Sequence, residues 1–494
     1  MSDWLVLLIV GPILAAILPI VFGIVRKGTG RFVALLLAIW QVGATAWVLK
    51  LVLARGRFTY EVGDFAPPFG IELVADGVSA PLLLLIALVT LLVVLYTFAS
   101  GPRSDPFYSE LMLLLAGLSG LTATGDVFNL YVFLEITGLA TYAIVASGDA
   151  PGAAYASLKY LIVGTVGASF YLLGVGYLFV ATGTLNMADL ASSLPEVGYT
   201  SPLVVAAFGL VAVGLSVKVA LFPLHTWQPD AYADSPHAVS AYIAALVSTA
   251  AAYALFRITY GVFTVDFFEA VPVARNALLY MAAVSVAVGA VLAVMQTDLK
   301  RMLAYSSVSH FGLVVLGFAL ANETAATGGL IHLVGHGVMK GGLFLAVGVF
   351  ATVAGVRTVD GIAGLGNRLP ITSAAFAALA FSMVGVPPAV GFPGKWNILL
   401  GAVEANQWVI VAVVAGSTLL TLGYFARLLE RLFFKEPTVE FDPERAPLVA
   451  DGGSLEEPFG RVAIVVFVAV AAIALGIGVT GLTDGFAPVL EVYF

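Results

Sequence analysis

The sequence is a succession of long apolar segments separated by short polar stretches, and this pattern restricts the chain to one kind of fold. A helix needs about 20 apolar residues to cross a bilayer, and about fourteen segments have that length. They begin near residues 3, 31, 72, 107, 126, 152, 202, 237, 272, 302, 325, 369, 407 and 461. Only 11% of the residues are charged, whereas soluble proteins carry about 25%. The chain is therefore predicted to be an all-α, polytopic membrane protein.

The basic residues favour one orientation in the membrane. If the N-terminus lies outside, the inside loops carry most of the arginines and lysines: Arg26, Lys27, Arg31, Arg103, Lys300, Arg301, Arg357, Arg368, Arg427, Arg431 and Lys435. The opposite loops carry few, chiefly Arg55, Arg57 and Arg275. Because loops on the cytoplasmic side are enriched in lysine and arginine, we expect a cell-membrane protein with both termini outside.

Several classes of protein are excluded by what the sequence lacks. There are no cysteines, so the chain has no disulfides, thiolate zinc sites or cysteine-bound iron–sulfur clusters of its own. It also lacks a phosphate-binding P-loop and a strand-borne GxGxxG motif, so we expect no bound cofactor. The net charge of −8 fits a high-salt organism, or simply an acidic loop between residues 436 and 457.

Two apolar segments are interrupted by prolines in a similar way. The first is SVKVALFPLHTWQPDAY (216–232), in which Lys218 precedes Pro223. The second is MVGVPPAVGFPGKWNILL, in which three prolines precede Lys395. In transporters, paired broken helices are typical of inverted repeats with the ion path at the breaks.

Ionisable residues lie at membrane depth, where a charge costs several kcal/mol unless it is paired or hydrated. Glu135 follows Asp126 by nine residues on one predicted helix, and Lys218 is deep in its segment. Lys159 lies about two turns into a helix, so its ammonium could reach the interface. A structural ion pair that fixes helix register is the alternative interpretation of Glu135 and Lys218.

The spacing of His332, His336 and Lys340 places all three along one face of a helix, because four residues advance slightly more than one turn. Three titratable side chains that merely packed there would be costly. A zinc site is the competing interpretation, but no third ligand accompanies the histidines, and an ammonium one turn away would repel a cation. No metal is therefore expected. His237 starts a helix, where packing or capping is the simpler interpretation.

Together these residues suggest a path for protons. A desolvated lysine can release its proton, a nearby carboxylate favours the charged form, and histidines titrate near neutral pH. Glu135 is predicted to modulate Lys218, the histidines His225, His310, His332 and His336 to relay protons, and Lys340 and Lys395 to release them. Water around the broken helices would fill the gaps.

Five motifs resemble those of the proton-translocating antiporter-like subunits of complex I, membrane-bound hydrogenases and Mrp antiporters. They are TGDVFNLYVFLE, LKRMLAYSSVSHFG, H-x3-H-x3-K, GVPPAVGFPGK, and the run of Lys218, Pro223, His225, Trp227, Pro229, Asp230 and Ala231. The resemblance extends from about residue 72 to 435. The stretches GTLNMADLA and TGDVFNLYVFLE are most similar to the D subunit of the Mrp antiporters.

The resemblance implies 14 helices with two inverted five-helix repeats, each containing a broken helix. Helices 1–3 would occupy residues 1–106, the repeats 107–260 and 272–435, and a loop and C-terminal helix 436–494. The family's glutamate corresponds to Glu135, its central lysine to Lys218 and its distal lysine to Lys395, with Lys340 on the second unit. Hydrophobic partner subunits in a hetero-oligomeric complex are also implied.

One position departs from the family pattern. Many members have a lysine in a stretch like LLTKVGVYAL, whereas this chain has LVSTAAAYAL with Thr249 at that point. A hydroxyl can hold a water molecule but cannot carry charge. Either the link from Lys218 to the second unit depends on water and on His310 or His332, or the link is weak.

Three functions remain open at this point. The first is a subunit of a Na⁺ (cation)/H⁺ antiporter, a secondary transporter driven by ion gradients. The second is the proton-pumping subunit of a redox complex, a translocase subunit without redox centres of its own. The third is a structural subunit with an impaired channel, which Thr249 supports and the retained charged residues oppose. The family wording favours the first.

Overall fold

In the computed structural model, which describes residues 3–436 and 457–494, nearly all of the chain is helical. The first part forms α1 (Asp3–Val25), α2 (Gly30–Arg55), β1 (Phe58–Glu61), η1 (Val62–Asp64), β2 (Glu72–Ala75), α3 (Ser79–Ser100), α4 (Asp105–Ala123), α5 (Val127–Ala146), α6 (Ala153–Thr182) and α7 (Met187–Val197). The middle forms α8 (Pro202–Val219), α9 (Gln228–Asp234), α10 (His237–Tyr242), η2 (Ile243–Val247), α11 (Ser248–Ile258), η3 (Thr259–Phe263) and α12 (Thr264–Ala270). The last part forms α13 (Pro272–Met295), α14 (Leu299–Ala319), α15 (Glu323–Ala354), α16 (Leu365–Arg368), α17 (Pro370–Val384), α18 (Gly391–Glu404), α19 (Trp408–Phe434), α20 (Phe459–Ile477) and α21 (Val479–Tyr493).

Within the described residues, 13 helices are long and apolar enough to cross a membrane. One of them is the continuous helical segment from His237 to Ala270, which contains the wider π-turns η2 and η3. The crossing expected near residue 369 is divided between α17 and α18. The predicted all-helical membrane architecture is thereby confirmed. Most of the acidic loop expected between 436 and 457 lies outside the described residues.

The helix expected near residue 72 begins later than predicted. Residues 72–75 form β2, which pairs antiparallel with β1 so that Phe58 lies opposite Ala75. The helix α3 starts at Ser79 because the Asp76 carboxylate accepts the backbone N–H groups of Val78 and Ser79, at 3.0 and 2.9 Å. The apolar residues before Asp76 thus belong to a hairpin.

Side-chain caps fix where several helices begin. Asp126 accepts the N–H of Asn129 at the start of α5, and Asp298 accepts that of Arg301 at the start of α14. Asn322 caps α15 in the same way through the N–H of Ala325. Each carboxylate or amide oxygen satisfies a backbone donor that has no partner within the helix.

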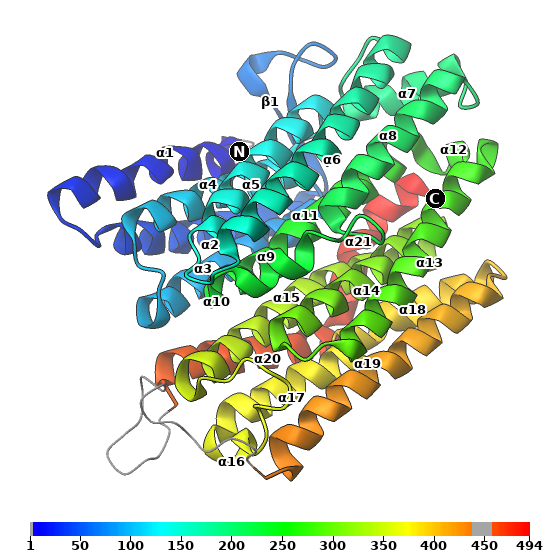
Figure 1. Ribbon diagram of the computed structural model, residues 1–494. Coiled ribbons are helices and arrows are strands. Elements are labelled where there is room, and N and C mark those ends of the chain that lie inside the picture. Colours follow the sequence, from blue (N-terminus) through cyan, green and yellow to red (C-terminus); the bar gives the residue numbers. More distant parts are fainter. Residues whose placement is uncertain (1–2, 437–456) are drawn as a thin grey trace.

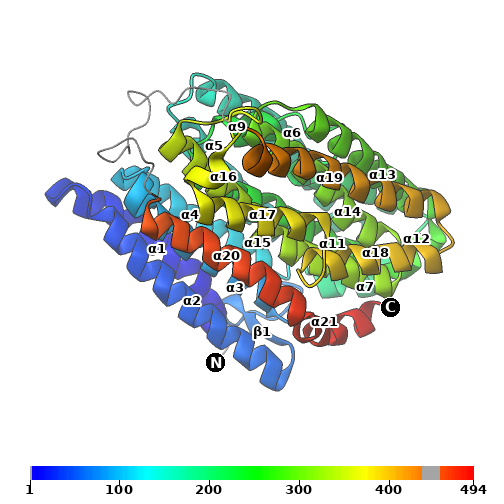
Figure 2. The same cartoon turned by 90° about the horizontal axis from the view of Figure 1, so that it is seen from below.

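The helices form two packed groups, α4 to α8 and α13 to α19, with α9 to α11 between them (Figure 1). Within the groups α6 packs along α8, α13 along α14, and α15 along α18. Figure 2 shows α1 to α3 and α20 running together along one side of the molecule. The division into units 107–260 and 272–435 and the inverted relation between them stay predictions. The helical segment that begins at His237 continues past residue 260, the predicted end of the first unit.

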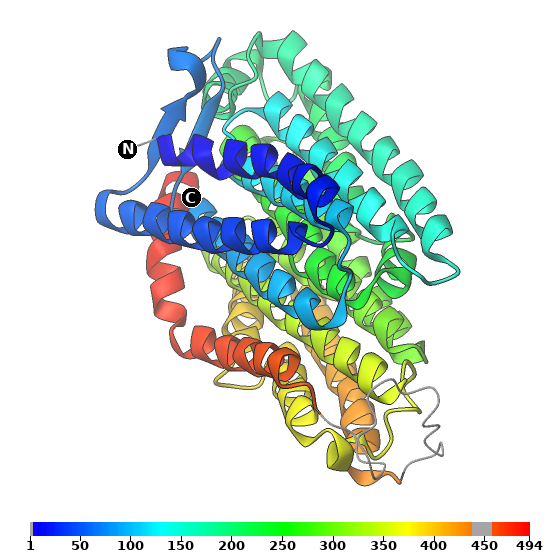
Figure 3. The same ribbon diagram turned by 90° about the vertical axis from the view of Figure 1, so that its left-hand side faces the viewer.

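Both ends of the described chain lie beside the β1–β2 hairpin (Figure 3). We call this side of the molecule the terminal end. Because successive crossings alternate in direction, the loops after α1, α3 and α5 lie at the other side, which we call the basic end. A cavity of about 500 Å³ at the basic end is lined by Arg103, Lys300, Arg301 and Arg357, together with Asp149, Asp234 and Asp298.

A buried arginine joins three elements at the terminal end. Arg257 on α11 forms an ion pair with Asp76 and donates to the hydroxyls of Tyr253 and Tyr493, at 2.6 and 3.0 Å. Burial by itself raises the pKa of Asp76, but the Arg257 charge and two backbone N–H groups lower it below its usual value. The pair therefore stays charged at neutral pH and ties α21 to α11 and α3.

Candidate functional site

The first broken helix places Lys218 in the interior of the protein. α8 ends at Val219, and Ala220 takes a left-handed conformation with φ of 67°. The carbonyl of Val217 accepts the Trp227 indole N–H at 2.9 Å, and the carbonyl of Lys218 accepts the Ser248 hydroxyl at 3.4 Å. Backbone groups freed within a membrane must find new partners, and these two side chains supply them.

Glu135 and Lys218 meet across α5 and α8. Lys218 Nζ lies 3.4 Å from Glu135 Oε1, and the two side chains are 7% and 23% exposed, the lysine being the less exposed. The predicted pairing of a carboxylate with the lysine before the break is therefore present. The carboxylate is the more accessible member, so it can exchange protons or move while the lysine stays buried.

Tyr142 completes this group, although none of the sequence motifs predicted it. Its hydroxyl lies 3.2 Å from Lys218 Nζ. Gly164 on α6 leaves room for that hydroxyl, because a Cβ at Gly164 would lie only 2.1 Å from the hydroxyl oxygen. Tyr142 follows Glu135 by seven residues, almost two full turns, so helical spacing offered a signal.

Lys159 forms an ion pair, whereas the sequence suggested that its ammonium could reach the membrane interface. Its Nζ lies 2.7 Å from Asp230 Oδ2, and the other oxygen of Asp230 lies 2.7 Å from the Arg301 guanidinium. Asp230 belongs to α9, directly after the break, whereas Lys159 is on α6 and Arg301 on α14. One carboxylate therefore joins the two groups of helices.

His332, His336 and Lys340 face α14 in a row, as their spacing predicted. His332 Nε2 lies 2.9 Å from His310 Nδ1, and the two rings stack at 5.2 Å between centroids. The His336 ring lies 4.4 Å from the ring of Phe311. Lys340 Nζ donates to the Leu303 carbonyl at 2.9 Å. All four titratable side chains are completely buried.

The second broken helix carries Lys395. α17 ends at Val384, and Gly385 takes a positive φ of 96°. Lys395 Nζ, on α18, donates to the carbonyls of Met383 and Val384 at 2.8 and 3.0 Å. This lysine therefore satisfies backbone acceptors that the break leaves free.

Three other predicted residues are placed more loosely. His225 lies in the turn between α8 and α9, its ring 5.4 Å from Phe222 and 5.9 Å from Tyr305. Thr249 is buried, and its hydroxyl has no hydrogen-bond partner in the described part of the chain. Asp126 caps α5 near the terminal end, away from the Glu135–Lys218 pair.

A buried polar network lies beside Lys218 on the side of the second group. Gln228 Nε2 donates to the Tyr232 hydroxyl at 3.0 Å and to Ser248 Oγ at 3.4 Å. Ser248 in turn contacts the Lys218 carbonyl and precedes Thr249. No charged motif marks these residues, so the sequence alone does not predict them as part of the site.

Over residues 3–436 and 457–494, no group of three or more His, Cys, Asp or Glu side chains is arranged to hold a metal ion. The buried polar side chains of this interior include amines, imidazoles, carboxylates and hydroxyls. These groups can accept, hold and pass protons.

Residues 124–421 match the family model described as "NADH:quinone oxidoreductase/Mrp antiporter, TM". The match spans more than half of the chain and includes both broken helices. The chain belongs to this family. The resemblance predicted from the motifs is confirmed, because the matched residues contain all five of them.

Two relatives and one solved structure illustrate the range of the family. The chain is 45% identical over 412 residues to the N subunit of the NADH-quinone oxidoreductase of Desulforudis audaxviator, covering 82% of this chain and 81% of the relative. It is 31% identical over 439 residues to the D subunit of the Na⁺/H⁺ antiporter of Bacillus subtilis, covering 88% of each. A chain of the membrane-bound sulfane sulfur reductase, an archaeal respiratory membrane complex, superposes with a TM-score of 0.89 at 31% identity, covering 99% of this chain and 98% of that chain.

Proposed function

We propose that this chain is the proton-translocating subunit of a multisubunit Na⁺ (cation)/H⁺ antiporter. The observation that carries the proposal is the Glu135–Lys218 pair, buried at the point where α8 is broken. Membership of the family and the similarity to the D subunit of an antiporter support it.

The pair works as a switch because its two members respond to each other. Burial favours a neutral amine, and a carboxylate within a few ångströms favours the charged form. When Glu135 is protonated or moves away, Lys218 releases its proton, and when Glu135 returns, Lys218 takes up another. The Tyr142 hydroxyl keeps the ammonium in place between these events, because it accepts a hydrogen bond from Lys218 Nζ.

From Lys218 the proton passes toward α15 through hydroxyl groups. Ser248, Tyr232 and Gln228 form a continuous set of contacts of 3.0–3.4 Å beside the Lys218 backbone. Thr249 adds a buried hydroxyl whose partner we assign to water. This set takes the place of the lysine that many relatives have at position 249.

The second group of helices receives the proton on the histidine row. The His310–His332 contact of 2.9 Å suits transfer between rings, and His336 and Lys340 continue along the same face of α15. Lys395 at the second break is the last member of the series. His225, at the turn between α8 and α9, serves as a side branch toward Lys159 and Asp230.

The basic end is assigned to the inside of the cell, so that both termini lie outside. The loops at that end hold most of the basic residues, and such loops remain on the cytoplasmic side. The cavity at the basic end, lined by Asp234 and Lys300 among others, is then the inside mouth. Burial raises the pKa of Asp234 above its usual value, which favours proton uptake by this carboxylate.

The proposal is tested on the complex purified from its native membrane and reconstituted in vesicles. A pH-sensitive dye inside reports proton movement when a Na⁺ gradient is imposed without any redox substrate. We expect wild-type vesicles to respond and Lys218→Ala vesicles to respond at least tenfold more slowly, with the complex still assembled. Lys50→Ala is the control, because Lys50 lies on α2 and contacts only the Trp47 ring among the described residues.

Transport at the wild-type rate in Lys218→Ala would contradict the relay. Na⁺-independent transport that requires an electron donor would contradict the antiporter assignment and leave the relay intact.

A redox-driven complex is the second candidate, and the 45% identity to an NADH-quinone oxidoreductase subunit favours it. The chain has no cysteines, so any iron–sulfur cluster would belong to a partner subunit. Visible absorbance of clusters or flavin in the purified complex would identify this driver. Colourless hydrophobic partners alone would support the antiporter.

A structural subunit with an impaired channel is the third candidate. Thr249 favours it, but Glu135, Lys218, Lys340 and Lys395 are all buried or half-buried and within hydrogen-bond distance of a partner. An inactive channel has no need of four such groups, whose burial is costly.

A further inference from the structure

Two cavities meet at the terminal end. The first, about 630 Å³, is bordered by the end of α2, the β1–β2 hairpin, α7, α12 and α21. The second, about 330 Å³, is an almost wholly apolar groove between α3, α15 and α20. Both are lined by Leu53, Gly77 and Gly485, so they form one space with a polar mouth and an apolar extension.

We propose that this space binds one phospholipid with an amine headgroup, placing the headgroup in the mouth and an acyl chain in the groove. The site lies apart from the residues of the proton relay, and the inference does not depend on the proposed function.

The groove has the length of one lipid leaflet. Pro81, Leu84, Leu88 and Leu92 line it at spacings of three or four residues, which is one face of α3. At 1.5 Å per residue, the stretch from Pro81 to Val93 is about 18 Å long. Half of a hydrocarbon core of about 30 Å is about 15 Å, so an acyl chain entering from the mouth would reach the membrane centre.

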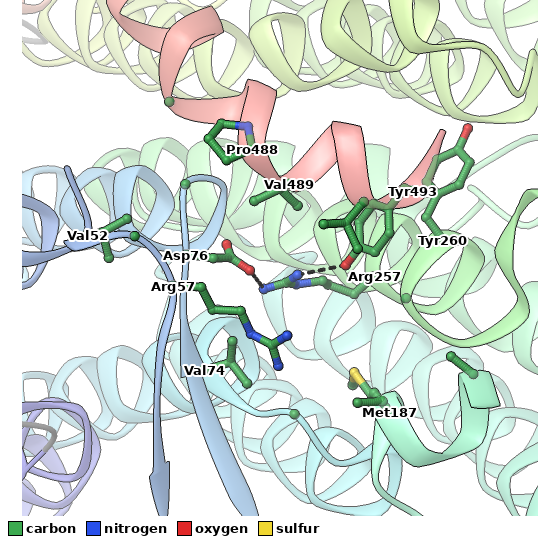
Figure 4. Close-up of a pocket in the computed structure, with 18 of the residues that line it drawn as sticks. Val52, Arg57, Val74, Asp76, Met187, Arg257, Tyr260, Pro488, Val489 and Tyr493 are labelled. Carbon is green, nitrogen blue, oxygen red and sulfur yellow. Dashed lines mark hydrogen bonds and ion pairs between the residues drawn. The ribbon is translucent and has the colours of Figure 1, made fainter. Parts of the chain in front are cut away.

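The mouth offers one cation that is free to bind a phosphate. Arg257 already uses its guanidinium for Asp76, Tyr253 and Tyr493, as Figure 4 shows for the first and last of these. Arg57 is different: its guanidinium has no ion pair or hydrogen bond in the described part of the chain, and Figure 4 shows it pointing into the cavity. Arginine binds phosphate oxygens through paired N–H groups.

The same mouth holds carboxylates that favour an ammonium. Glu72 accepts only an amide N–H from Asn186 among the described residues, at 3.3 Å, and Asp484 lines the cavity without an ion pair in the described ranges. One free arginine and two unpaired carboxylates match a zwitterionic headgroup better than an anionic one. A purely anionic lipid would meet the carboxylates with like charge.

The groove also borders α15, the helix that carries the histidine row. Val334, Val338 and Gly341 form its α15 wall, on the opposite side of the helix from His332, His336 and Lys340. The bound chain therefore contacts this helix without touching the relay residues.

The headgroup is tested by native mass spectrometry of the intact complex after stepwise delipidation. We expect wild type and Arg55→Gln to retain a phosphatidylethanolamine that Arg57→Gln loses at about tenfold lower detergent exposure. Arg55 is a matched control because it ends α2, two residues before Arg57, but does not line the cavity. Equal retention in Arg57→Gln, or preference for added phosphatidylglycerol or free inorganic phosphate, would overturn the assignment.

The groove is tested with a phosphatidylethanolamine that carries a photoreactive group in its acyl chain. We expect crosslinks to peptides of α3 and α20 in wild type and in Leu95→Trp, and at least fivefold fewer in Leu88→Trp. Leu88 lines the groove, whereas Leu95 is on the same helix, 39% exposed, and outside the lining. Unchanged crosslinking in Leu88→Trp, or a partner subunit crosslinked to these peptides in place of lipid, would refute the proposal.

Discussion

Lys218 differs from the other buried lysines in what it touches. Lys300, Lys340 and Lys395 donate to backbone carbonyls, which cannot change their charge. Lys218 lies beside the Glu135 carboxylate and the Tyr142 hydroxyl. Among the four, in the described part of the chain, only Lys218 lies within hydrogen-bond distance of a carboxylate, whose protonation can set the charge of the amine.

Tyr142→Phe should slow transport without abolishing it. The substitution removes an acceptor 3.2 Å from Lys218 Nζ but leaves the Glu135 contact. Hydrogen bonds to charged groups contribute about 1.5–3 kcal/mol, so we expect proton flux in vesicles to fall roughly tenfold. Tyr280→Phe, on the outer face of α13, should transport normally. An unchanged rate in Tyr142→Phe would remove this residue from the switch.

Thr249→Lys should preserve or increase proton flux. Thr249 lies on α11, between α8, which carries Lys218, and α15. Its neighbour Ser248 contacts the Lys218 carbonyl. Ala245, one turn earlier on the same helical segment, lies so close to α15 that its carbonyl would touch a Cβ placed at Gly337. A lysine at this point would supply the charge carrier that the hydroxyl cannot. The measurement is vesicle transport together with yield of the assembled complex.

Ala250→Lys is the control for Thr249→Lys, because residue 250 is the next residue and is equally buried. We expect the Ala250→Lys complex to fail in assembly. Loss of assembly in Thr249→Lys as well would mean that the position only packs against apolar neighbours.

At the scale of the elements, the two broken helices are stabilised in different ways. In the first, neutral side chains donate to carbonyls at the end of α8: Trp227 to that of Val217, and Ser248 to that of Lys218. In the second, the Lys395 amine itself binds Met383 and Val384. Lys218 is thereby left available for Glu135, whereas Lys395 is held by its own break.

Trp227→Phe should destabilise the first break. The ring would still stack on Tyr160, which lies 3.8 Å away between centroids, but the Val217 carbonyl would lose the indole donor and keep only the Ala220 N–H at 3.2 Å. One intramolecular hydrogen bond contributes about 0.5–1.5 kcal/mol. We expect a lower unfolding temperature of the complex and slower transport. Trp396→Phe, at a half-exposed ring on α18, should change neither. Identical melting of the two variants would show that another donor replaces the indole.

At the scale of the whole molecule, charge is distributed unevenly between the two ends. The basic end holds most arginines and lysines, and the terminal end holds the hairpin, α21 and the Arg257–Asp76 tie. Burying this tie in the terminal end fixes α21 against α11 and α3.

The orientation is testable by labelling, since the chain has no native cysteine. We expect Glu61→Cys, in the hairpin, to react with a membrane-impermeant maleimide on intact cells. Asp149→Cys, at the basic end between α5 and α6, should react only after the membrane is opened. The reverse pattern would place both termini inside.

Much of this architecture follows from the sequence because it depends on local properties. The length and polarity of a segment decide whether it can cross a bilayer, and prolines accompany both broken helices. The row of His332, His336 and Lys340 follows from helix periodicity alone. The charge of the loops favours one orientation. The hairpin at residues 58–75 was missed because Leu73, Val74 and Ala75 are as apolar as the helix that follows Asp76.

The tertiary structure alone decided which of these features meet. Tyr142 and Lys218 are 76 residues apart, His310 and His332 are 22 apart, and Arg257 reaches Asp76 across 181 residues. These contacts depend on how helices pack against each other, and apolar helices that all fit the bilayer carry little sequence information about their neighbours. The same holds for the cavity at the terminal end, which exists only where the ends of α2, α3 and α21 come together.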